Sequence, residues 1–163
     1  MISILITNYN KEKFLNKNLK KLFKSNYKNF EVLVFDDVST DNSLNILKKF
    51  KKIRLVVNKN KKFNSPALNQ IYGIKKIFTI SKGDVICLLD GDDSFTVNKL
   101  YEINKIFKKN KFKSIYNLPY TQTHNFQIKE KKYSVWPTIF PTSCISLRRK
   151  EFKKFLKHIC SNK

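Results

Sequence analysis

The sequence has little glycine and proline, three and four residues in 163, and this scarcity excludes a collagen-like fibre or a linker-rich chain. It also lacks a long apolar run, since no stretch approaches the roughly 20 apolar residues of a membrane span. The first apolar run, residues 1–6, is broken at once by the polar residues 7–10, which is unlike a signal peptide. We therefore expect a chain that is either free in the cytoplasm or peripheral at the inner face of the membrane.

Cysteine is sparse and shows no pairing pattern. Cys87, Cys144 and Cys160 are odd in number and far apart, and no Cys-x-x-Cys pair occurs. This spacing argues against a disulfide framework or a cysteine zinc site and fits reduced thiols in the cytosol.

Acidic residues are few, with 12 against 34 basic residues and a net charge of +22. Such an excess favours anionic partners, whether nucleotides, phosphorylated substrates, acidic lipid surfaces or nucleic acid. Nearly all of the positive charge is lysine, and asparagine, isoleucine and phenylalanine are abundant too, as AT-rich genomes encode. Compositional bias and solvated lysine faces therefore explain most of the charge, which by itself predicts no particular partner.

Four apolar runs of strand length, residues 2–7, 30–35, 53–57 and 85–89, alternate with helical patterns. The helices are expected over 11–25 with Asn10 as cap, from 39–41 to 50, from Ser65-Pro66 through Phe78, and from a Thr96 cap to about 110. This alternation predicts an α/β fold in three layers, with a mostly parallel sheet between helices. Beyond residue 113 the pattern weakens to strands at 114–118, 133–135 and 143–147 and a helix at 149–158. No repeat or second domain is visible.

Three of the four strands end in polar residues: 7–10, 36–41 and 90–93. In an open α/β sheet, ligands bind outside the carboxyl ends of the strands. Carboxylates gathered at one place repel one another unless a cation, a donor or a proton relieves them. Mg²⁺ or Mn²⁺, held by one or two carboxylates and by substrate phosphates, is the expected cation.

At these strand ends the sequence resembles a known family. Residues 4–10 (ILITNYN), 30–43 (FEVLVFDDVSTDNS) and 83–93 (GDVICLLDGDD) resemble, in order and spacing, the donor-binding half of family 2 glycosyltransferases. Each piece alone is weak, and the three together are specific. The resemblance covers about the first hundred residues. It implies a single Rossmann-like GT-A domain over 1–163, with a donor half at 1–113 and a partial acceptor half at 114–163.

The resemblance also implies an activity. A family 2 enzyme transfers a sugar, with inversion, from a nucleoside-diphosphate sugar to an acceptor hydroxyl. A UDP-sugar is the favoured donor, Mn²⁺ or Mg²⁺ the cofactor, and a sugar or lipid-linked saccharide the acceptor. Cell-envelope polysaccharide synthesis is a typical setting of such enzymes.

Residue roles follow by position from the same resemblance. Thr7, Asn8 and Tyr9 would line the nucleoside pocket, with Tyr9 beside the base. Asp37 would accept a hydrogen bond from the base imide, and Asp36 would support that turn. In the Asp-x-Asp motif, Asp90 would lie near the ribose and Asp92 would bind the metal, with Asp90 as a second candidate ligand. Asp93 would be a neighbouring site carboxylate.

The sequence departs from the family pattern in the third helix. Family members commonly carry Ala-Arg-Asn-x-Gly-Ile there, whereas this chain has Leu68 at the arginine position and a wider spacing to Gly73-Ile74. A basic contact to the donor is therefore either missing or supplied by Lys61 or Lys62.

No catalytic base is predicted. The family's base is a carboxylate downstream of a segment that resembles residues 141–149 (PTSCISLRR), where it takes the acceptor's proton. After Asp93 the only acidic residues are Glu102, Glu130 and Glu151, and none is at a matching position. A truncated or partial enzyme is therefore expected in preference to a new mechanism.

Other interpretations stay open. Residues 36–41 suit turn and helix-capping chemistry equally well. A calcium loop is excluded, because the sixth position from Asp90 is Phe95 instead of glycine and the twelfth is Tyr101 instead of glutamate. The spacing of Asp90 and Asp92 also mimics the nucleophile motif of haloacid-dehalogenase-like phosphatases, which need a further acidic pair downstream that this sequence lacks.

Two alternatives come from other functional classes. A catalytically incomplete relative would hold the donor without turning it over. A basic nucleic-acid-binding protein would explain the charge of +22 but not the carboxylates at the strand ends, and no nucleic-acid-binding motif is present. We therefore expect no nucleic-acid partner. Arg148 and Arg149 could contact a phosphorylated lipid carrier, although a solvated helix start is the simpler interpretation.

Overall fold

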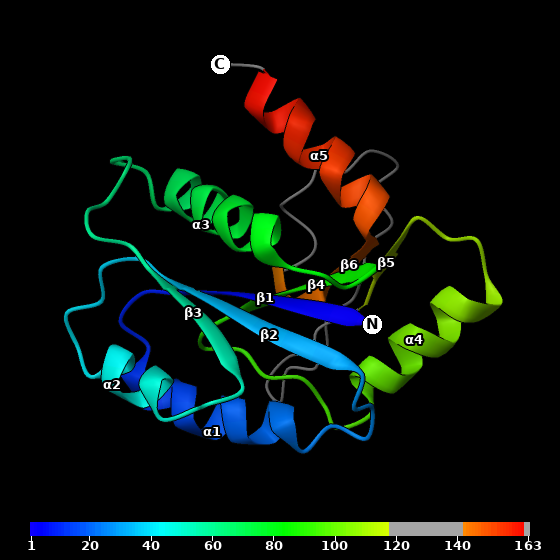
Figure 1. Cartoon of the computed structure of the whole chain (residues 1–163), viewed down its shortest axis with the longest axis horizontal. Helices are drawn as coiled ribbons and strands as arrows, with labels where there is room; N and C mark the ends of the chain where they lie inside the picture. Colours follow the sequence, from blue (N-terminus) through cyan, green and yellow to red (C-terminus); the bar gives the residue numbers. More distant parts are fainter. Residues whose placement is uncertain (118–141, 162–163) are drawn as a thin grey trace, which may run out of the picture.

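A six-stranded sheet in the order β3-β2-β1-β4-β6-β5 lies between two layers of helices (Figure 1). The structure is a computed structural model that describes residues 1–117 and 142–161. The strands are β1 (Ile2–Asn8), β2 (Phe30–Asp36), β3 (Ile53–Val57), β4 (Val85–Asp90), β5 (Ser114–Tyr116) and β6 (Ile145–Arg148). The helices are α1 (Glu12–Phe23), α2 (Ser43–Lys48), α3 (Pro66–Ile80), α4 (Lys99–Lys109) and α5 (Arg149–Ser161), with a 3₁₀ turn η1 (Thr142–Cys144). The predicted α/β class with a mostly parallel sheet is confirmed.

The four N-terminal strands are parallel, and β1 lies between β2 and β4. Ile4 pairs with Val32 on one side and with Cys87 on the other. The chain moves outward from β1 to β3 and then crosses back to place β4 on the opposite side of β1. The strand order therefore reverses between β1 and β4, and ligands of open α/β sheets bind in the crevice at such a point.

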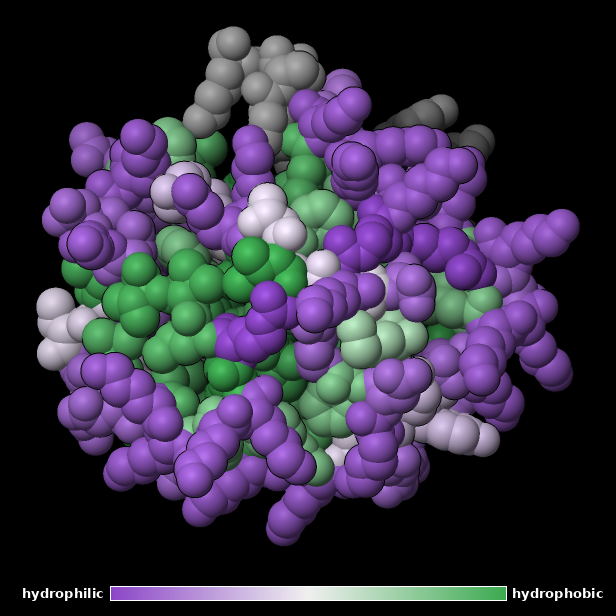
Figure 2. Space-filling view, in the orientation of Figure 1, coloured by the Kyte–Doolittle hydropathy of each residue, from purple (hydrophilic) through white to green (hydrophobic). Residues whose placement is uncertain are grey.

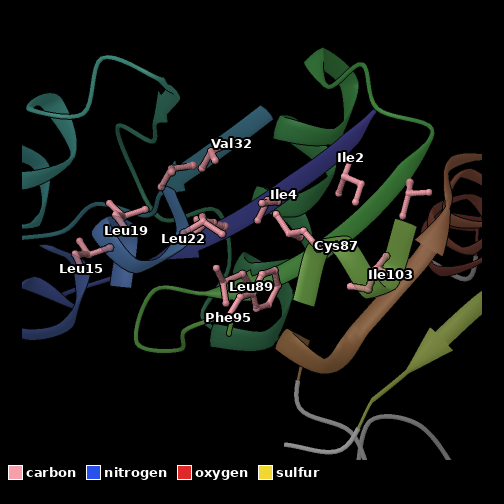
Figure 3. Packing of buried hydrophobic residues seen from close by; sticks show 14 of the residues in the cluster. Ile2, Ile4, Leu15, Leu19, Leu22, Val32, Cys87, Leu89, Phe95 and Ile103 are labelled. Atoms are coloured by element: carbon pink, nitrogen blue, oxygen red, sulfur yellow. The ribbon is translucent and has the colours of Figure 1, made fainter. Parts of the chain in front are cut away.

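Side chains of the central strands alternate between two apolar cores, as the period of a strand requires. Ile4 and Ile6 face the cluster formed with α1, α2 and α4, of which Figure 3 shows a part. Leu5 faces the opposite cluster, formed with α3 and α5. Because both faces are covered, these strands read as continuous apolar runs in the sequence.

Strands β5 and β6 close one edge of the sheet and run antiparallel to their neighbours. Two arginines secure this edge. Arg148 donates to the carbonyl oxygens of Phe107 and Asn110 at 2.7 and 2.8 Å, at the end of α4. Arg149 donates to the carbonyl oxygen of Gly83 at 2.6 Å. Both guanidinium groups therefore hold backbone carbonyls, and the simpler interpretation of a solvated helix start is wrong for them.

Several predicted boundaries and caps are wrong. Asn10 does not cap α1, because its side-chain oxygen accepts a hydrogen bond from the Thr40 backbone N–H at 2.8 Å. Phe14, expected to be buried, is 48% exposed. Helices α2 and α4 begin later than predicted. The strand expected at 133–135 lies outside the described residues.

In the part of the chain that the structure describes, no helix combines the length and apolarity needed to cross a membrane.

Candidate functional site

A cleft of about 730 Å³ opens at the carboxyl ends of β1, β2 and β4. Six of the residues predicted from the strand ends line it: Thr7, Asn8, Tyr9, Asp37, Asp90 and Asp92. They come from three segments that are far apart in the sequence and that the parallel strands bring to one edge. Asp36 and Asp93 do not line the cleft.

Asp36 lies behind the cleft as a structural anchor. It is fully buried, and its carboxylate accepts hydrogen bonds from Asn8 Nδ2 at 2.7 Å, from the Ser39 backbone N–H at 3.0 Å and from Ser39 Oγ at 2.7 Å. Its oxygens are thus occupied by the protein, which corrects its assignment as a ligand contact. It fixes the turn that presents Asp37, in agreement with the supporting role that the resemblance implied.

Asp37 faces the cleft from a strained turn. The next residue, Val38, has a φ of 62°, a left-handed conformation that is unfavourable for a β-branched side chain. Asn58, which follows β3, donates from Nδ2 to Asp37 Oδ1 at 2.8 Å. This bond occupies one carboxylate oxygen and orients the group.

Tyr9 gives the cleft an aromatic wall. The side chain is 43% exposed, and the Lys61 ammonium lies 3.8 Å from the centroid of its ring. Lys61 belongs to the loop between β3 and α3 and lines the cleft, whereas Lys62 does not. Of the two lysines considered as basic contacts, Lys61 is the one placed to make it.

Asp90 is held from two sides at the end of β4. Gln70 Nε2 in α3 donates to its Oδ1 at 2.7 Å, and Thr7 Oγ1 donates to the same oxygen at 3.3 Å. Burial and then the negative charges of Asp93 and Asp92 raise the pKa of Asp90 to about 6, although the two hydrogen bonds lower it. Three carboxylates are therefore close enough to repel one another.

Two lysines balance this negative charge. Lys11 Nζ lies 2.6 Å from Asp92 Oδ2, inside the cleft. Lys99, at the start of α4, donates to the Ser143 carbonyl oxygen at 2.7 Å. Burial lowers the pKa of Lys99, while the nearby Cys87 and Cys144 thiols and the Asp93 carboxylate raise it. Asp93 thus lies on the Lys99 side of the turn, outside the cleft.

The turn after β4 is also fixed by the C-terminal part of the chain. The Asp90 backbone N–H donates to Ser143 Oγ at 2.9 Å, and Ser143 lies in the short 3₁₀ turn η1.

The sequence model of the family described as "Glycosyl transferase family 2" matches residues 3–161, which include both segments. The chain belongs to glycosyltransferase family 2.

Curated glycosyltransferases are similar to this chain over part of its length. An uncharacterized glycosyltransferase of Rickettsia bellii is 33% identical over 111 residues, which are 68% of this chain and 16% of the relative. The UDP-Glc:alpha-D-GlcNAc-diphosphoundecaprenol beta-1,3-glucosyltransferase WfaP of Escherichia coli is 31% identical over 100 residues. That alignment covers 61% of this chain and 38% of WfaP. The chain thus spans well under half the length of these family 2 relatives.

Solved structures confirm the GT-A fold expected for the family. TarS of S. aureus, in complex with UDP-GlcNAc, superposes with a TM-score of 0.73 at 18% identity, over 94% of this chain and 47% of TarS. The mannosyltransferase PcManGT of Pyrobaculum calidifontis, in complex with GDP-Man and Mn²⁺, superposes with a TM-score of 0.73 at 12% identity. This superposition covers 94% of this chain and 46% of PcManGT.

The oxygen atoms of the cleft suit a hard divalent cation that is bound partly by the protein and partly by a phosphate. Among the described residues, no group of three or more histidine, cysteine or acidic side chains is arranged to enclose a metal ion. Asp92 instead offers a carboxylate in the cleft, with the carboxylates of Asp90 and Asp93 close by. Mg²⁺ and Mn²⁺ at phosphate sites are commonly bound by one or two carboxylates together with substrate oxygens and water. These residues fit the metal that family 2 implies.

Sequence reasoning missed two side chains of the site. Lys11 directly follows the polar stretch 7–10, and its place at a helix start after β1 was the available signal. Gln70 lies in the first turns of α3, where only an arginine was sought, at position 68. Leu68 is 38% exposed and does not line the cleft, whereas Gln70 lines the cleft and donates a hydrogen bond to Asp90.

Proposed function

We propose that this chain binds a nucleoside-diphosphate sugar and forms the donor site of an inverting, metal-assisted glycosyltransferase. The observation that carries the proposal is the convergence of Tyr9, Asp37 and Asp92, from three separate strand ends, on one cleft of about 730 Å³. That volume is in the range of small-molecule sites. The cleft lies where open α/β sheets bind their ligands.

The nucleoside end of the donor fits between Tyr9 and Asp37. The exposed Tyr9 ring offers a face on which a base can stack. Asp37, held through one oxygen by Asn58, has its other oxygen available to accept an N–H from a base imide. Uracil carries such an imide, and we therefore favour a UDP-sugar as the donor.

The diphosphate end fits between the acidic turn and the lysines of the cleft. Asp92 is the proposed metal ligand, with Asp90 near the ribose or as a second ligand, and Mn²⁺ or Mg²⁺ would neutralise charge on the leaving nucleoside diphosphate. Lys61, beside the Tyr9 ring, adds positive charge to the lining of the cleft. The acceptor hydroxyl would attack the anomeric carbon from the face opposite the leaving group, which inverts the stereochemistry.

Proton removal from the acceptor is assigned to neither of the two downstream acids that the structure describes. Glu102 is exposed in α4, and Glu151 pairs with Lys154 at 3.4 Å in α5. Neither lines the cleft. Glu130 lies outside the described residues. The proposal therefore covers donor binding by this chain and leaves the base to a group other than Glu102 and Glu151.

We propose a sugar or a lipid-linked saccharide as the acceptor and the cytoplasmic face of the membrane as the place of action. WfaP, by its name, acts on a diphosphoundecaprenol-linked sugar. A net charge of +22 suits peripheral contact with an anionic lipid surface. Envelope polysaccharide synthesis is the corresponding biological setting.

A thermal-shift panel of nucleoside-diphosphate sugars tests the proposal. At a UDP-sugar concentration of 100 times Kd and with Mn²⁺, binding adds about 2.7 kcal/mol to the free energy of unfolding, which should raise Tm by about 5 to 10 °C. Asp92→Ala should lose the metal-dependent part of the shift, and Asp37→Ala should weaken the preference for uracil. Equal shifts in wild type and Asp92→Ala would refute the assignment.

Donor-hydrolysis and RNA-binding assays separate the alternatives. Donor binding without donor hydrolysis or transfer would identify a catalytically incomplete relative. Salt-dependent binding of generic RNA, with no effect of Mn²⁺ and a nucleotide sugar, would instead support a basic nucleic-acid-binding protein.

A further inference from the structure

Lys11 makes the closest ionic contact of the cleft. Its Nζ lies 2.6 Å from Asp92 Oδ2, and the two side chains are 36% and 38% exposed. They are 81 residues apart in the sequence, so the fold and not a local helical spacing brings them together. Both residues line the cleft, and the ammonium contacts one carboxylate oxygen of Asp92, Oδ2.

The backbone of Lys11 and the first part of its side chain are held in place. Its backbone N–H donates to Ser43 Oγ at 3.1 Å, and its carbonyl oxygen accepts the first hydrogen bonds of α1. The aliphatic stem passes over Gly91, where an added Cβ would come within 3.3 Å of Lys11 Cγ. Backbone and stem thus direct the ammonium to Asp92, and a side chain at position 91 would meet Asn8 Oδ1, at 2.6 Å, before it met the stem.

An ammonium ion and a divalent cation cannot both contact the same face of one carboxylate. Mg²⁺ binds oxygen ligands at about 2.0–2.1 Å, closer than the lysine nitrogen lies, and the two positive charges repel each other. A cation that binds Asp92 in the absence of a donor must therefore displace Lys11 or bind the other carboxylate oxygen against the repulsion of the ammonium. Donor phosphates change this balance, because they supply ligands to the metal and an anionic partner to the lysine.

We propose that Lys11 is an internal counter-ion of Asp92 that competes with the divalent cation until a diphosphate takes the lysine over. The inference rests on the proposed function and deepens it. It makes metal and donor binding mutually dependent: the free protein binds the metal weakly, and the donor tightens it. By linkage, the metal tightens donor binding by the same factor.

Mn²⁺ titration of the nucleotide-free protein tests this competition, for example by calorimetry or by the electron paramagnetic resonance signal of free Mn²⁺. Lys11→Met keeps an unbranched side chain as far as the ε position and removes the charge. We expect it to bind Mn²⁺ about tenfold more tightly than wild type, as loss of one nearby positive charge implies for a half-exposed pair. Thermal unfolding of each variant confirms that the fold is retained.

The matched control is Lys13→Met, which removes the same charge from an exposed position of α1. It should change Mn²⁺ affinity by less than about twofold, because solvent and salt screen distant surface charges. Equal Mn²⁺ affinity of wild type and Lys11→Met would overturn the proposal, as would Mn²⁺ binding too weak to measure in every variant.

A second titration, with UDP present, separates this inference from the proposed function. In wild type, UDP should tighten Mn²⁺ binding, and in Lys11→Met that tightening factor should fall about tenfold, since the competitor is already gone. If UDP binds neither protein, the proposed function fails. The nucleotide-free titration still decides whether Lys11 competes with the metal for Asp92.

Discussion

At the scale of single residues, Asp90 shows how the site is held at a cost in stability. The carboxyl group is largely buried beside two other carboxylates, and its pKa is raised from 3.8 to about 6. The bonds from Gln70 and Thr7 fix its orientation but do not restore its ordinary pKa. Functional sites often carry such unfavourable groups.

Asp90→Asn should therefore stabilise the metal-free protein at neutral pH. The folded state holds the Asp90 proton more tightly than the unfolded state does, so the free energy of unfolding falls as pH rises from about 4 to 6. A shift of this size corresponds to at most about 3 kcal/mol. Urea unfolding in a chelating buffer should show the variant about 1–3 kcal/mol more stable at pH 7.5 and close to wild type near pH 4.

Asp84→Asn is the control, because Asp84 is exposed and, among the described residues, forms an ion pair with the N-terminal ammonium alone, at 3.2 Å. It should leave the pH dependence of stability unchanged within about 0.5 kcal/mol. If Asp90→Asn differs from wild type equally at both pH values, the raised pKa is not the cause.

Residue types at strand ends could be read from the sequence, but their partners could not. The strand-end pattern predicted Tyr9, Asp37 and Asp92, and the parallel register brings them to one cleft. The contacts of Lys11 and Gln70 span 81 and 20 residues and depend on how helices pack against the sheet. No local pattern carries that information.

At the scale of elements, α3 packs against β2 through a glycine. A Cβ at Gly73 would come within 2.8 Å of Cε1 in the buried Phe35 ring, which also lines the cleft. The absence of a side chain lets helix and sheet approach closely, and this places Gln70 over Asp90. The same helix begins with the predicted Ser65 cap and Pro66, and Ser65 Oγ accepts from the Leu68 N–H at 3.4 Å.

Gly73→Ala should destabilise the protein although alanine is the better helix former. The gain of about 1 kcal/mol in helix propensity is outweighed by overpacking against Phe35, which typically costs 1–3 kcal/mol. We expect a net loss of about 1 kcal/mol in urea unfolding. Thr79→Ala, exposed on the same helix, should stay within about 0.5 kcal/mol of wild type. A Gly73→Ala protein as stable as wild type would show that the contact is not tight.

The strands that the structure describes were predicted to within a residue or two, and so were the starts of α1, α3 and α5, whereas α2 and α4 begin later than predicted. The central strands are fixed by continuous apolar runs that must be buried on both faces. The starts of α1 and α2 depend instead on an exchange between loops: Asp41 accepts from the Glu12 N–H at 3.0 Å and from the Ser43 N–H at 2.9 Å. Capping residues that serve another segment look the same in sequence as those that cap their own helix.

At the scale of the whole molecule, a strongly basic surface surrounds an acidic cleft. Figure 2 shows hydrophilic side chains over most of this face, around an apolar patch at the β3 edge of the sheet, where Val57 is 45% exposed. The net charge of +22 attracts anions, while the carboxylates of the cleft repel them unless a cation is present. A metal ion bound together with a diphosphate offsets the negative charge of the carboxylates and supplies an anion for the basic surroundings.

Calorimetric titration of UDP into the 163-residue protein, with and without Mn²⁺, tests this account most directly. Bridging of the diphosphate to Asp92 predicts that Mn²⁺ strengthens UDP binding by at least about tenfold, or 1.4 kcal/mol. Asp92→Asn should remove that gain while leaving the metal-free affinity within a few fold. UDP affinity that is indifferent to Mn²⁺ in the wild-type protein, or undetectable at millimolar nucleotide, would contradict it.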